Sequence, residues 1–533
     1  WYLFRKGAKC FGRIIDDQVV GAEVTNTRFV ASMLGEMFQV SGKCIKSNGE
    51  YFFIHTENFY IREFNGIQPI SSLVVQPMNE KIYTMLVERG KQFEDVALGH
   101  HYKQYGGYIL YERAWGTNLF KADGRVMVDI KTFQRMNPEY SNFKDPNHIG
   151  GNTAAYTQDQ YNYNYNNPNG VPQLSAKMTT IQKNVLYMTW PTVAGFSFAC
   201  KKWGEIVVSL LSEIHFDDKA YSRLVLSKEK KNMVKALVDH HQKHRKIFTD
   251  IISGKGSGRI FLLHGPPGVG KTLTAEAIAE HLHDPLYSVT VGELGTSTKD
   301  LEAKLQEILE VASIWNAVIL IDEADIFLEQ RNDFDVTRNA MVGIFLRLLE
   351  YHQGVLFLTT NRVKCFDEAF HSRISVALRY SELSNEARRR IWHNFLKMVD
   401  VQLSDNELNQ LSEFKMNGRQ IRTNLQLAQA LAQSEKKPLD FSYISRTLTV
   451  SNQFEDVPSE GPAENWDKFK FSPKFDDETL DLDEDTESED EKKNSKTESK
   501  EDKPAAKEQQ DSPKPKEKKE KKKKKAVINN NNA

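Results

Sequence analysis

The chain has 533 residues, and its 71 Lys and Arg residues almost balance its 72 Asp and Glu residues, which gives a formal net charge of −1. This balance excludes a uniformly basic nucleic-acid-binding protein, although it leaves room for a local basic patch. The four cysteines form no CxxC pair, which argues against a zinc knuckle and a disulfide scaffold. No apolar run approaches the ~18–20 residues that span a bilayer. We therefore expect an intracellular protein of the cytoplasm or nucleus that makes no membrane contact.

Residues 1–205 are predicted to form an α+β domain of uncharacterised function. Asn79–Gly90 is predicted to be a helix that stops at its glycine. Residues 157–170 (TQDQYNYNYNNPNG) are polar without a periodic core face, which predicts a disordered insertion. Met188–Ser209 is apolar and strand-like, and we expect it to pack as a linker onto the next part of the chain. The other predicted strands are Tyr51–Ile54, Phe59–Ile61, Leu73–Val75, Gly107–Tyr111 and Arg125–Ile130.

An α/β pattern comes after residues 206–258, which are predicted to be a linker and a helix (Lys228–Ile252) leading into it. Over residues 259–382, short apolar strands alternate with amphipathic helices, which indicates a buried parallel sheet. Residues 383–450 are predicted to be entirely helical. The strands are Ile260–Leu263, Leu286–Val291, Val318–Ile321, Val355–Thr359 and Ile374–Ala377, and the last four helices are Glu386–Val399, Asp405–Phe414, Arg419–Gln433 and Leu439–Thr447.

Residues 451–533 are predicted to be a disordered tail, because blocks of like charge repel each other and stay solvated. An acidic block, Asp476–Glu491, is followed by a lysine-rich block, Lys514–Lys525. The lysine block is compatible with a nuclear-import signal, a nucleic-acid contact or a solubilising end, of which the last is the simplest interpretation.

The strongest signal in the sequence is GPPGVGKT, Gly265–Thr272, which satisfies the phosphate-loop pattern G-x-x-x-x-G-K-[ST] between a predicted strand and a predicted helix. Backbone N–H groups can wrap phosphates only where side chains are small, and the helix N-terminus adds partial positive charge. Lys271 would contact the β- and γ-phosphates, and the Thr272 hydroxyl would ligate Mg²⁺. A plain glycine-rich turn would leave this Lys-Thr pair unexplained. The predicted nucleotide-binding residues are Gly265, Pro266, Pro267, Gly268, Val269, Gly270, Lys271, Thr272 and Leu273.

Consecutive carboxylates end a second apolar strand, Ala317–Ile321. Asp322 is predicted to hold Mg²⁺, through water, and Glu323 to polarise the attacking water as general base. Alternation along a strand points neighbouring side chains to different sides, which fits two separate roles. An apolar strand leaving the core could end in acids without any such role, but the nearby phosphate loop makes that interpretation weak.

Polar residues also end the strand Val355–Thr359. In an open parallel sheet, ligands bind at the carboxyl ends of the strands. Asn361 is therefore a candidate for contact with the γ-phosphate or the attacking water. Taken alone, the pattern is equally typical of an ordinary loop.

Together these motifs resemble an AAA-type member of the AAA+ ATPase superfamily over about residues 228–448. GPPGVGKT resembles its Walker A motif, VILIDEAD its Walker B motif and LTTNR its sensor 1 region. The resemblance implies a P-loop NTPase fold of class α/β: an AAA+ module with a parallel sheet sandwiched by helices and a C-terminal helical lid. Here it is preceded by the α+β domain and followed by the charged tail. It also implies ATP and Mg²⁺ as cofactors, with adenine near Phe248–Ile252.

The resemblance extends to three arginines. FDEAFHSRI resembles the second region of homology, in which Arg373 would be an arginine finger acting on ATP held by a neighbouring subunit. This implies a homo-oligomer, a hexameric ring. NGRQI resembles the sensor 2 position, with Arg419 reaching the γ-phosphate and Arg422, one turn away, as the competing choice.

The phrases GHHYKQYGG, KADGRVMVD and KKWGEI make about residues 1–450 similar to a fungal group of AAA ATPases with an uncharacterised N-terminal domain. The chain departs from the wider family in two ways. Many members have two arginines in the finger region, whereas here only Arg373 is present. Members that thread polypeptides carry an aromatic residue in a central pore loop, whereas Gly292–Lys299 reads GELGTSTK. The second departure argues against a polypeptide-threading unfoldase, which leaves open remodelling without full threading and action on a folded or nucleic-acid partner.

We therefore expect an ATPase that converts ATP and water to ADP and phosphate, working as a ring-forming remodelling mechanoenzyme on an unknown protein partner. The alternatives are an ATP-gated scaffold with low turnover and a nucleic-acid-directed ATPase that uses the basic tail. The expected catalytic residues are Glu323, Asn361, Arg373 and Arg419, and the expected metal ligands are Thr272 and Asp322.

Overall fold

The computed structural model describes residues 2–14, 18–32, 35–113, 116–146, 177–243, 258–295, 297–329, 335–362 and 368–452. The chain divides into two units, residues 1–457 and 458–533. The predicted insertion at 157–170, the expected adenine contact at 248–252 and the predicted tail from 453 onward lie outside the described residues. Within the described ranges, none of the helices combines the length and the apolar character needed to cross a bilayer.

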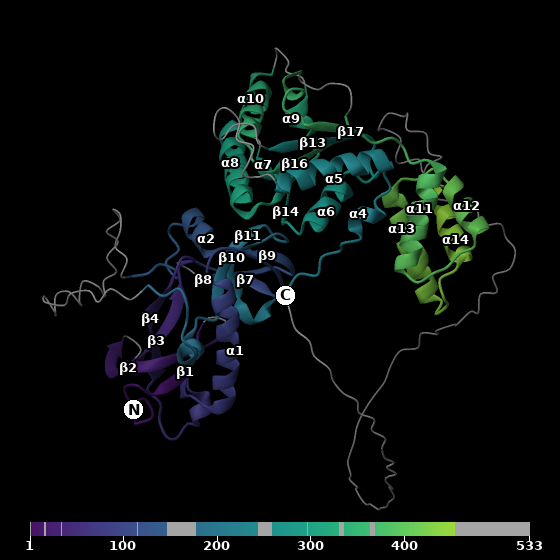
Figure 1. Cartoon of the computed structure of the whole chain (residues 1–533). Coiled ribbons are helices and arrows are strands. Elements are labelled where there is room, and N and C mark those ends of the chain that lie inside the picture. The colour runs from purple at the N-terminus through teal and green to yellow at the C-terminus, as the bar shows by residue number, and fades with distance from the viewer. Residues whose placement is uncertain are drawn as a thin grey trace, which may run out of the picture. The chain divides into compact units, whose positions relative to one another are not determined.

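The front of the chain begins with a five-stranded antiparallel sheet in the order β4-β3-β2-β1-β5 (Figure 1). The two predicted strands at 51–54 and 59–61 are one strand, because the polar residues between them also pair, Lys43 with Thr56 and Ser41 with Asn58. Sheet pairing uses backbone groups, so polar side chains on an outer face do not interrupt it. The strands are β1 (Lys9–Arg13), β2 (Val19–Ser32), β3 (Gly35–Ser47), β4 (Phe52–Arg62) and β5 (Val75–Pro77).

Helix α1 (Glu80–Val96) begins where the sequence predicts, with the Asn79 side chain accepting a hydrogen bond from the N–H of Ile82 at 2.9 Å. The predicted stop at Gly90 is wrong, since the helix continues for six further residues, to Val96. A Cβ atom at Gly90 would lie 2.2 Å from the carbonyl oxygen of Leu186. The glycine therefore permits close packing against the 3₁₀ helix η3 (Lys183–Met188) and does not end the helix.

A seven-stranded antiparallel sheet comes next, in the order β12-β6-β9-β10-β11-β7-β8. The segment Met188–Ser209 is strand-like and packs onto the next part of the chain, as predicted, but it is not a linker, since it supplies the hairpin β10–β11 at the middle of this sheet. Helix α2 (Ile130–Met136) follows β9 and is capped by Asp129. The strands are β6 (His101–Tyr105), β7 (Tyr108–Arg113), β8 (Gly116–Lys121), β9 (Gly124–Val128), β10 (Thr192–Ser197), β11 (Lys202–Val207) and β12 (Leu211–Ser212), and two further 3₁₀ turns are η2 (Ile70–Ser72) and η4 (Val208–Leu210).

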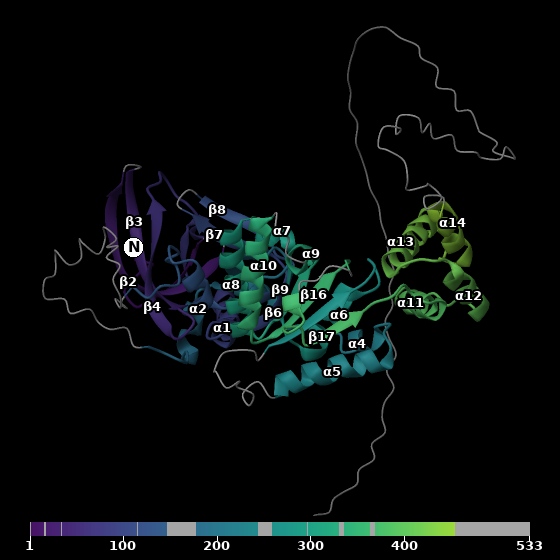
Figure 2. The same cartoon turned by 90° about the horizontal axis from the view of Figure 1, so that it is seen from above.

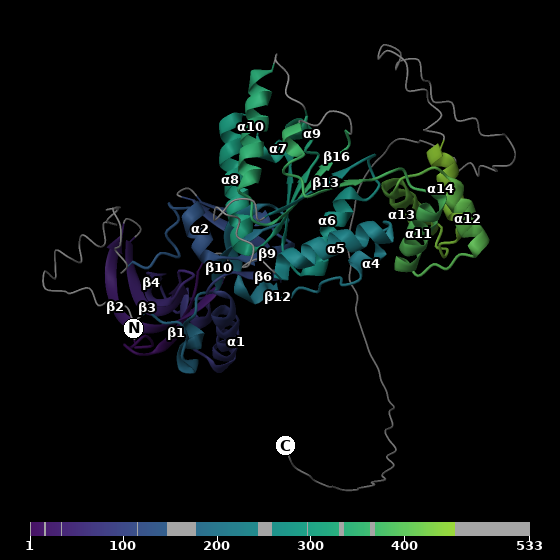
Figure 3. The ribbon, with the colours of Figure 1, turned by 45° about the horizontal axis from the view of Figure 1, so that its top comes forward.

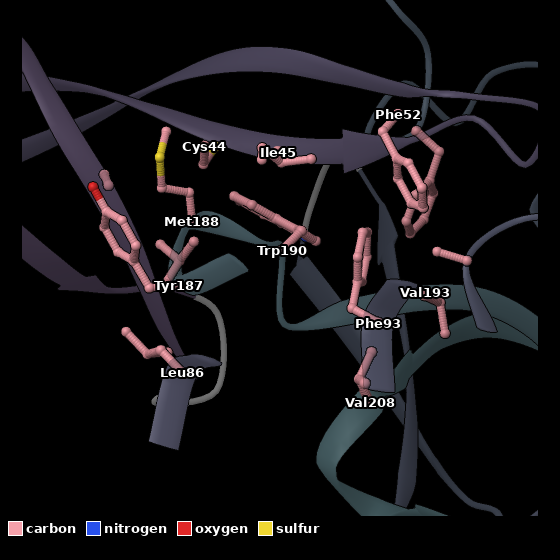
Figure 4. Close-up of a cluster of buried hydrophobic side chains, with 14 of the residues drawn as sticks. Cys44, Ile45, Phe52, Leu86, Phe93, Tyr187, Met188, Trp190, Val193 and Val208 are labelled. Atoms are coloured by element: carbon pink, nitrogen blue, oxygen red, sulfur yellow. The ribbon is translucent and has the colours of Figure 1, made fainter. Parts of the chain in front are cut away.

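One apolar core joins α1 to strands of both front sheets (Figure 4). Phe93 of α1 packs on Phe52 of β4 with ring centroids 5.9 Å apart, and both side chains are buried. Trp190, just before β10, and Val193, within β10, belong to the same cluster. The observed α+β architecture of the front part agrees with the prediction.

A five-stranded parallel sheet forms the middle of the chain, in the order β14-β15-β16-β13-β17. Each predicted strand of this region is present, with ends shifted by at most two residues. The first strand of this sheet in sequence, β13, lies between β16 and the outer strand β17. Its carboxyl end is at the edge where ligands bind in such sheets, beside the carboxyl end of the central strand β16. The strands are β13 (Arg259–His264), β14 (Leu286–Thr290), β15 (Val318–Asp322), β16 (Val355–Thr360) and β17 (Val376–Arg379).

Helices cover both faces of this sheet. Successive apolar side chains along each strand point to opposite faces, so both faces are apolar. Ile260 and Leu262 of β13 pack toward α8 and α10, whereas Phe261 and Leu263 pack toward α5 and α6. Figures 2 and 3 show α8 and α10 side by side, away from α5. The helices and turns are α4 (Ala220–Arg223), α5 (Lys228–Lys243), α6 (Lys271–Leu282), α7 (Val291–Leu294), α8 (Thr298–Trp315), α9 (Asp325–Leu328), α10 (Val336–Glu350) and η5 (Glu368–Phe370).

Four helices with a core of their own form the C-terminal part of the described chain. Trp392, Leu411, Ile421 and Ile444 are fully or nearly fully buried in this core. Ser404 and Asn417 cap two of the helices by reciprocal capping boxes. The predicted helical lid is thereby present, as α11 (Asn385–Met398), α12 (Asp405–Glu413), α13 (Gly418–Ser434) and α14 (Phe441–Asn452).

The packing of Gly90 makes a stability prediction. Gly90→Ala should destabilise the front domain by about 1–3 kcal/mol, because the new methyl group overlaps the Leu186 carbonyl. Gly343→Ala is the matched control: Gly343 lies inside α10 with no atom within 4 Å of the added Cβ, so alanine should stabilise by about 0.5–1 kcal/mol. Thermal unfolding of both variants measures whether each substitution lowers or raises the stability of the protein. Equal behaviour would contradict the role given to Gly90.

Candidate nucleotide and magnesium site

The loop between β13 and α6 forms a backbone cradle at the end of the sheet. Gly265, Gly268 and Gly270 all have positive φ angles, of 144°, 73° and 100°, which residues with a Cβ adopt at a cost. At Gly265 a Cβ would also lie 2.2 Å from the carbonyl oxygen of Tyr380. The glycines predicted from the sequence are therefore required by the loop conformation. Of the remaining predicted loop residues, Val269 packs against the apolar core and Leu273 is exposed.

Lys271 lies at the centre of the site. Its ammonium donates to the carbonyl oxygens of Gly265 (2.8 Å) and Pro266 (2.6 Å) and to Oδ1 of Asn361 (2.8 Å). The residue is only 7% exposed. Burial lowers the pKa of Lys271, the carboxylate of Asp322 opposes this effect, and the guanidinium of Arg419 adds to it. The structure thus joins Lys271 to Asn361, two residues that separate sequence motifs had indicated.

Thr272 and Asp322 form the second part of the site. The Thr272 hydroxyl donates to both carboxylate oxygens of Asp322, at 3.3 and 3.2 Å. Mg²⁺ prefers oxygen ligands and usually takes only one or two from protein, with substrate phosphates and water as the rest. Among the described residues no cluster of three or more His, Cys, Asp or Glu could hold a metal by itself. A hydroxyl and a carboxylate beside a phosphate cradle fit Mg²⁺ bound together with a nucleotide.

Glu323 stands at the same edge with an exposed side chain. Its φ of 57° is in the left-handed region, which costs a non-glycine residue about 1–3 kcal/mol and is often found at functional sites. The residue before it, Asp322, continues the strand β15. Since the strand ends at Asp322 and the backbone turns at Glu323, the alternation expected along the strand does not extend to Glu323.

Thr359, which sequence patterns did not single out, holds this turn. Its hydroxyl donates to Asp322 and accepts a hydrogen bond from the backbone N–H of Glu323 at 3.0 Å. Its carbonyl accepts from the N–H of Ala324 at 2.9 Å. Thr359 is 1% exposed and pairs with Leu263 across the sheet. A hydroxyl at the end of a buried strand is the signal that could have indicated it.

The lid contacts the cradle through the start of α13. The N–H of Gly418 donates to the carbonyl oxygen of Gly268 at 2.9 Å, and a Cβ at Gly268 would lie 2.6 Å from the Asn417 side chain. Arg419 is close enough to Lys271 for its charge to lower the pKa of Lys271. The charge of Arg422 instead opposes the rise that burial causes in the pKa of Glu276 of α6. The helix N-terminus and Arg419 together place positive charge beside the phosphate cradle.

Arg373 lies apart from these contacts. It donates to the carbonyl oxygen of Ala369 at 2.8 Å and to Glu350 at 3.4 Å. Its interactions within the chain therefore do not bring it to Lys271 or Asp322.

Comparison with known proteins finds family matches for two parts of the chain. Residues 261–382 match the model of the "ATPase family associated with various cellular activities (AAA)", and residues 1–81 match a "Domain of unknown function (DUF7025)". The parallel sheet, its covering helices and the glycine loop thus make up an AAA+ fold. The chain contains an AAA-type ATPase domain with a nucleotide-binding P-loop.

Several curated proteins are similar over part of their length. A putative 26S proteasome regulatory subunit homolog of Methanothermobacter marburgensis is 28% identical over 207 residues, which are 36% of this chain and 55% of the relative. ATPase family AAA domain-containing protein 3B of Homo sapiens is 30% identical over 143 residues, 26% of this chain and 22% of the relative. ATPase family AAA domain-containing protein FIGL1 of Arabidopsis thaliana is 31% identical over 171 residues, 30% of this chain and 25% of the relative.

The chain thus spans about a quarter to a half of the length of these relatives. The crystal structure of the FIGL-1 AAA domain in complex with ADP aligns with 45% of this chain and 92% of that chain, at 20% identity and a TM-score of 0.35. A TM-score of this size carries no weight for the fold of this chain.

The hydrogen bonds of Thr359 make a prediction that distinguishes its hydroxyl from its volume. Thr359→Val keeps the shape but removes the hydrogen bonds from Thr359 to Asp322 and from the Glu323 N–H to Thr359, whereas Thr359→Ser keeps the hydroxyl. In Thr359→Val the Mg²⁺ concentration needed for half-maximal nucleotide binding should rise about tenfold, since a hydrogen bond to a charged group contributes about 1.5–3 kcal/mol. Fluorescent-nucleotide titration at varied Mg²⁺ measures it. Unchanged Mg²⁺ dependence in Thr359→Val would refute the role.

Proposed function

We propose that the protein hydrolyses ATP to ADP and phosphate and that it uses this reaction, as a ring of subunits, to remodel a partner. The single observation that carries the proposal is the meeting of Lys271, Asn361, Thr272 and Asp322 at one edge of the parallel sheet. A scaffold that only binds nucleotide would not need the exposed carboxylate of Glu323 beside them.

The glycine loop and Lys271 bind the phosphates. An ammonium group has three donors, and here two are given to loop carbonyls and one to Asn361. Phosphate oxygens are charged and accept stronger hydrogen bonds than carbonyl oxygens, so the bound nucleotide takes over some of these donors. Asn361 is then free to contact the γ-phosphate or the attacking water.

Glu323 acts as general base. Its exposed carboxylate accepts a proton from the attacking water as the water's oxygen bonds to the γ-phosphorus and the bond to the β-phosphate oxygen breaks. Thr272 and Asp322 would hold Mg²⁺, which neutralises charge on the phosphates when bound. Thr359 keeps the two acidic residues at fixed positions. Arg419, at the start of α13, adds positive charge from the lid.

We propose that the adenine lies near Phe248–Ile252, as the family resemblance implies. This segment is outside the residues that the structure describes.

We infer that Arg373 acts on ATP held by a neighbouring subunit, in a hexameric ring. Its contacts within the chain leave it outside its own phosphate site, and a ring would let it reach the next one. The partner is a protein remodelled without full threading, because Gly292–Lys299 has no aromatic residue. The similarity of residues 1–81 to a domain of unknown function is compatible with kinship to the fungal group.

Two substitutions test the binding and the chemistry separately. Lys271→Ala should abolish nucleotide binding, because it removes the central cation. Glu323→Gln should bind ATP with affinity close to that of the wild type but lower turnover by at least about a hundredfold, the usual contribution of a general base. Isothermal titration and steady-state phosphate release measure the two effects. Normal turnover in Glu323→Gln would exclude its assignment as base.

The ring is tested by Arg373→Ala. If the finger acts between subunits, the variant should bind ATP but hydrolyse it about 10³-fold more slowly, and wild-type turnover per subunit should rise with protein concentration. Arg347→Ala is the control, since Arg347, on α10, is also paired with a glutamate of this domain. Turnover of Arg373→Ala equal to that of the control would end the proposal of catalysis between subunits.

A further inference from the structure

An aromatic seam joins the front domain to the AAA domain. Phe196 and Trp203 of the hairpin β10–β11 meet Tyr287 of β14 and Trp315 of α8. Phe196 stacks on Tyr287 with ring centroids 5.4 Å apart, and Trp315 lies 5.6 Å from Phe196 and 5.5 Å from Trp203. Phe196 is 4% exposed and Trp315 is 2% exposed. This burial of large rings makes the seam a packed core, since such pairs add about 0.5–1.5 kcal/mol each beyond their area.

The seam is continuous with the core of the parallel sheet. Met127 of β9 and Phe196 belong to the same apolar cluster as Ile319 and Ile321 of β15, the strand that ends at Asp322. The front domain therefore completes one face of the AAA domain's own core. Removing it would expose apolar surface that the AAA domain otherwise keeps covered.

A buried carboxylate sets the alignment of the seam. Asp129 is 3% exposed, and its Oδ1 accepts from the N–H of Thr132 at 2.8 Å, which caps α2. Its Oδ2 accepts from the indole N–H of Trp315, also at 2.8 Å. One side chain thus holds a helix of the front domain and a helix of the AAA domain at the same time. Because both oxygens are buried, loss of either partner is costly.

Three ion pairs extend the contact between the front domain and the AAA domain to helices α6, α7 and α8. Arg125 pairs with Glu280 of α6 at 2.6 Å, Lys201 with Glu293 of α7 at 2.6 Å, and Arg135 with Glu310 of α8 at 2.5 Å. Helix α6 begins with Lys271, and Thr290 at the end of β14 pairs with Asp322. The front domain thus contacts elements that are continuous with, or paired to, both halves of the site.

We propose that the hairpin β10–β11 is a docking element that fastens the front domain to β14 and α8, and that this contact relays the nucleotide state of the P-loop site to the front domain. The relay rests on the proposed function, whereas the docking does not. Movement of α6 or β15 on nucleotide binding would reach the front domain through Glu280 and through Tyr287 and Trp315. The partner of this surface is the front half of the same chain.

Asp129→Asn tests the docking in the full-length protein without nucleotide. The amide oxygen still caps α2, but the amide nitrogen cannot accept from Trp315, so only the bond across the seam is lost. Backbone hydrogen exchange in α2 and α8 should become about ten- to a hundredfold faster, as expected for losing a hydrogen bond to a buried charge. Trp315→Phe removes the same bond from the other side and should give the same pattern. Exchange unchanged in both variants would overturn the docking.

The relay is tested with Mg²⁺ and a non-hydrolysable ATP analogue. In the wild type, the analogue should slow hydrogen exchange at residues 124–136 of the front domain as well as in α6. Asp129→Asn should bind the analogue within about twofold of the wild type but lose the effect at residues 124–136. If the wild type binds the analogue and residues 124–136 do not respond, the relay is wrong. If the wild type binds no nucleotide, the proposed function fails, and the docking is still decided by the nucleotide-free measurement.

Arg347→Ala serves again as the matched control. Its ion pair with Glu302 joins α10 to α8 within the AAA domain, at 2.5 Å, and does not touch the seam. Both the exchange rates of α2 and the response of residues 124–136 should stay at wild-type values in this variant. A loss of the response here too would attribute the effect to general loosening of α8 and would overturn the assignment to the docking contact.

Discussion

The three hydrogen bonds of the Lys271 ammonium are the contact on which the site depends. They join the loop carbonyls of Gly265 and Pro266 to Asn361 at the end of β16. Because a buried ammonium needs its donors satisfied, the loop and the strand end cannot separate without cost. The parallel sheet makes this possible because β13, which leads into the loop, pairs with β16, which ends one residue before Asn361. The glycines then let the loop turn back over the lysine.

The acidic half of the site is organised by a neutral residue. Thr359 bonds both Asp322 and the backbone of Glu323, whose φ of 57° is unfavourable for a residue with a side chain. A strained turn persists only where its surroundings hold it in several places, and here the side chain and the carbonyl of Thr359 both do so. The strained turn points Glu323 outward while Asp322 stays beside Thr272. The two carboxylates can therefore have different roles although they are adjacent in the sequence.

The elements that carry the site also carry the contact with the front domain. Helix α6 begins with Lys271 and reaches Arg125 through Glu280, and β14 pairs with β15 while Tyr287 stacks on Phe196. Packed cores switch between discrete arrangements and do not deform continuously. A shift of α6 or β15 at the phosphate site therefore moves the elements packed against them. The apolar seam and the bond between Asp129 and Trp315 connect the front domain to these elements.

Local patterns in the sequence determined the phosphate loop, Asp322, Glu323, the five parallel strands and the four lid helices, because each depends on the spacing or type of neighbouring residues. Tertiary structure alone decided the rest. The sequence predicts a helix end at Gly90, but this glycine packs against Leu186 within the helix. It predicts a linker at Met188–Ser209, but this segment forms the central hairpin of a sheet. Thr359, Asn417 and the bond from Trp315 to Asp129 act on residues distant in sequence, 186 positions away in the last case. Such contacts produce no periodic pattern in the sequence, since they arise only when separate elements pack together.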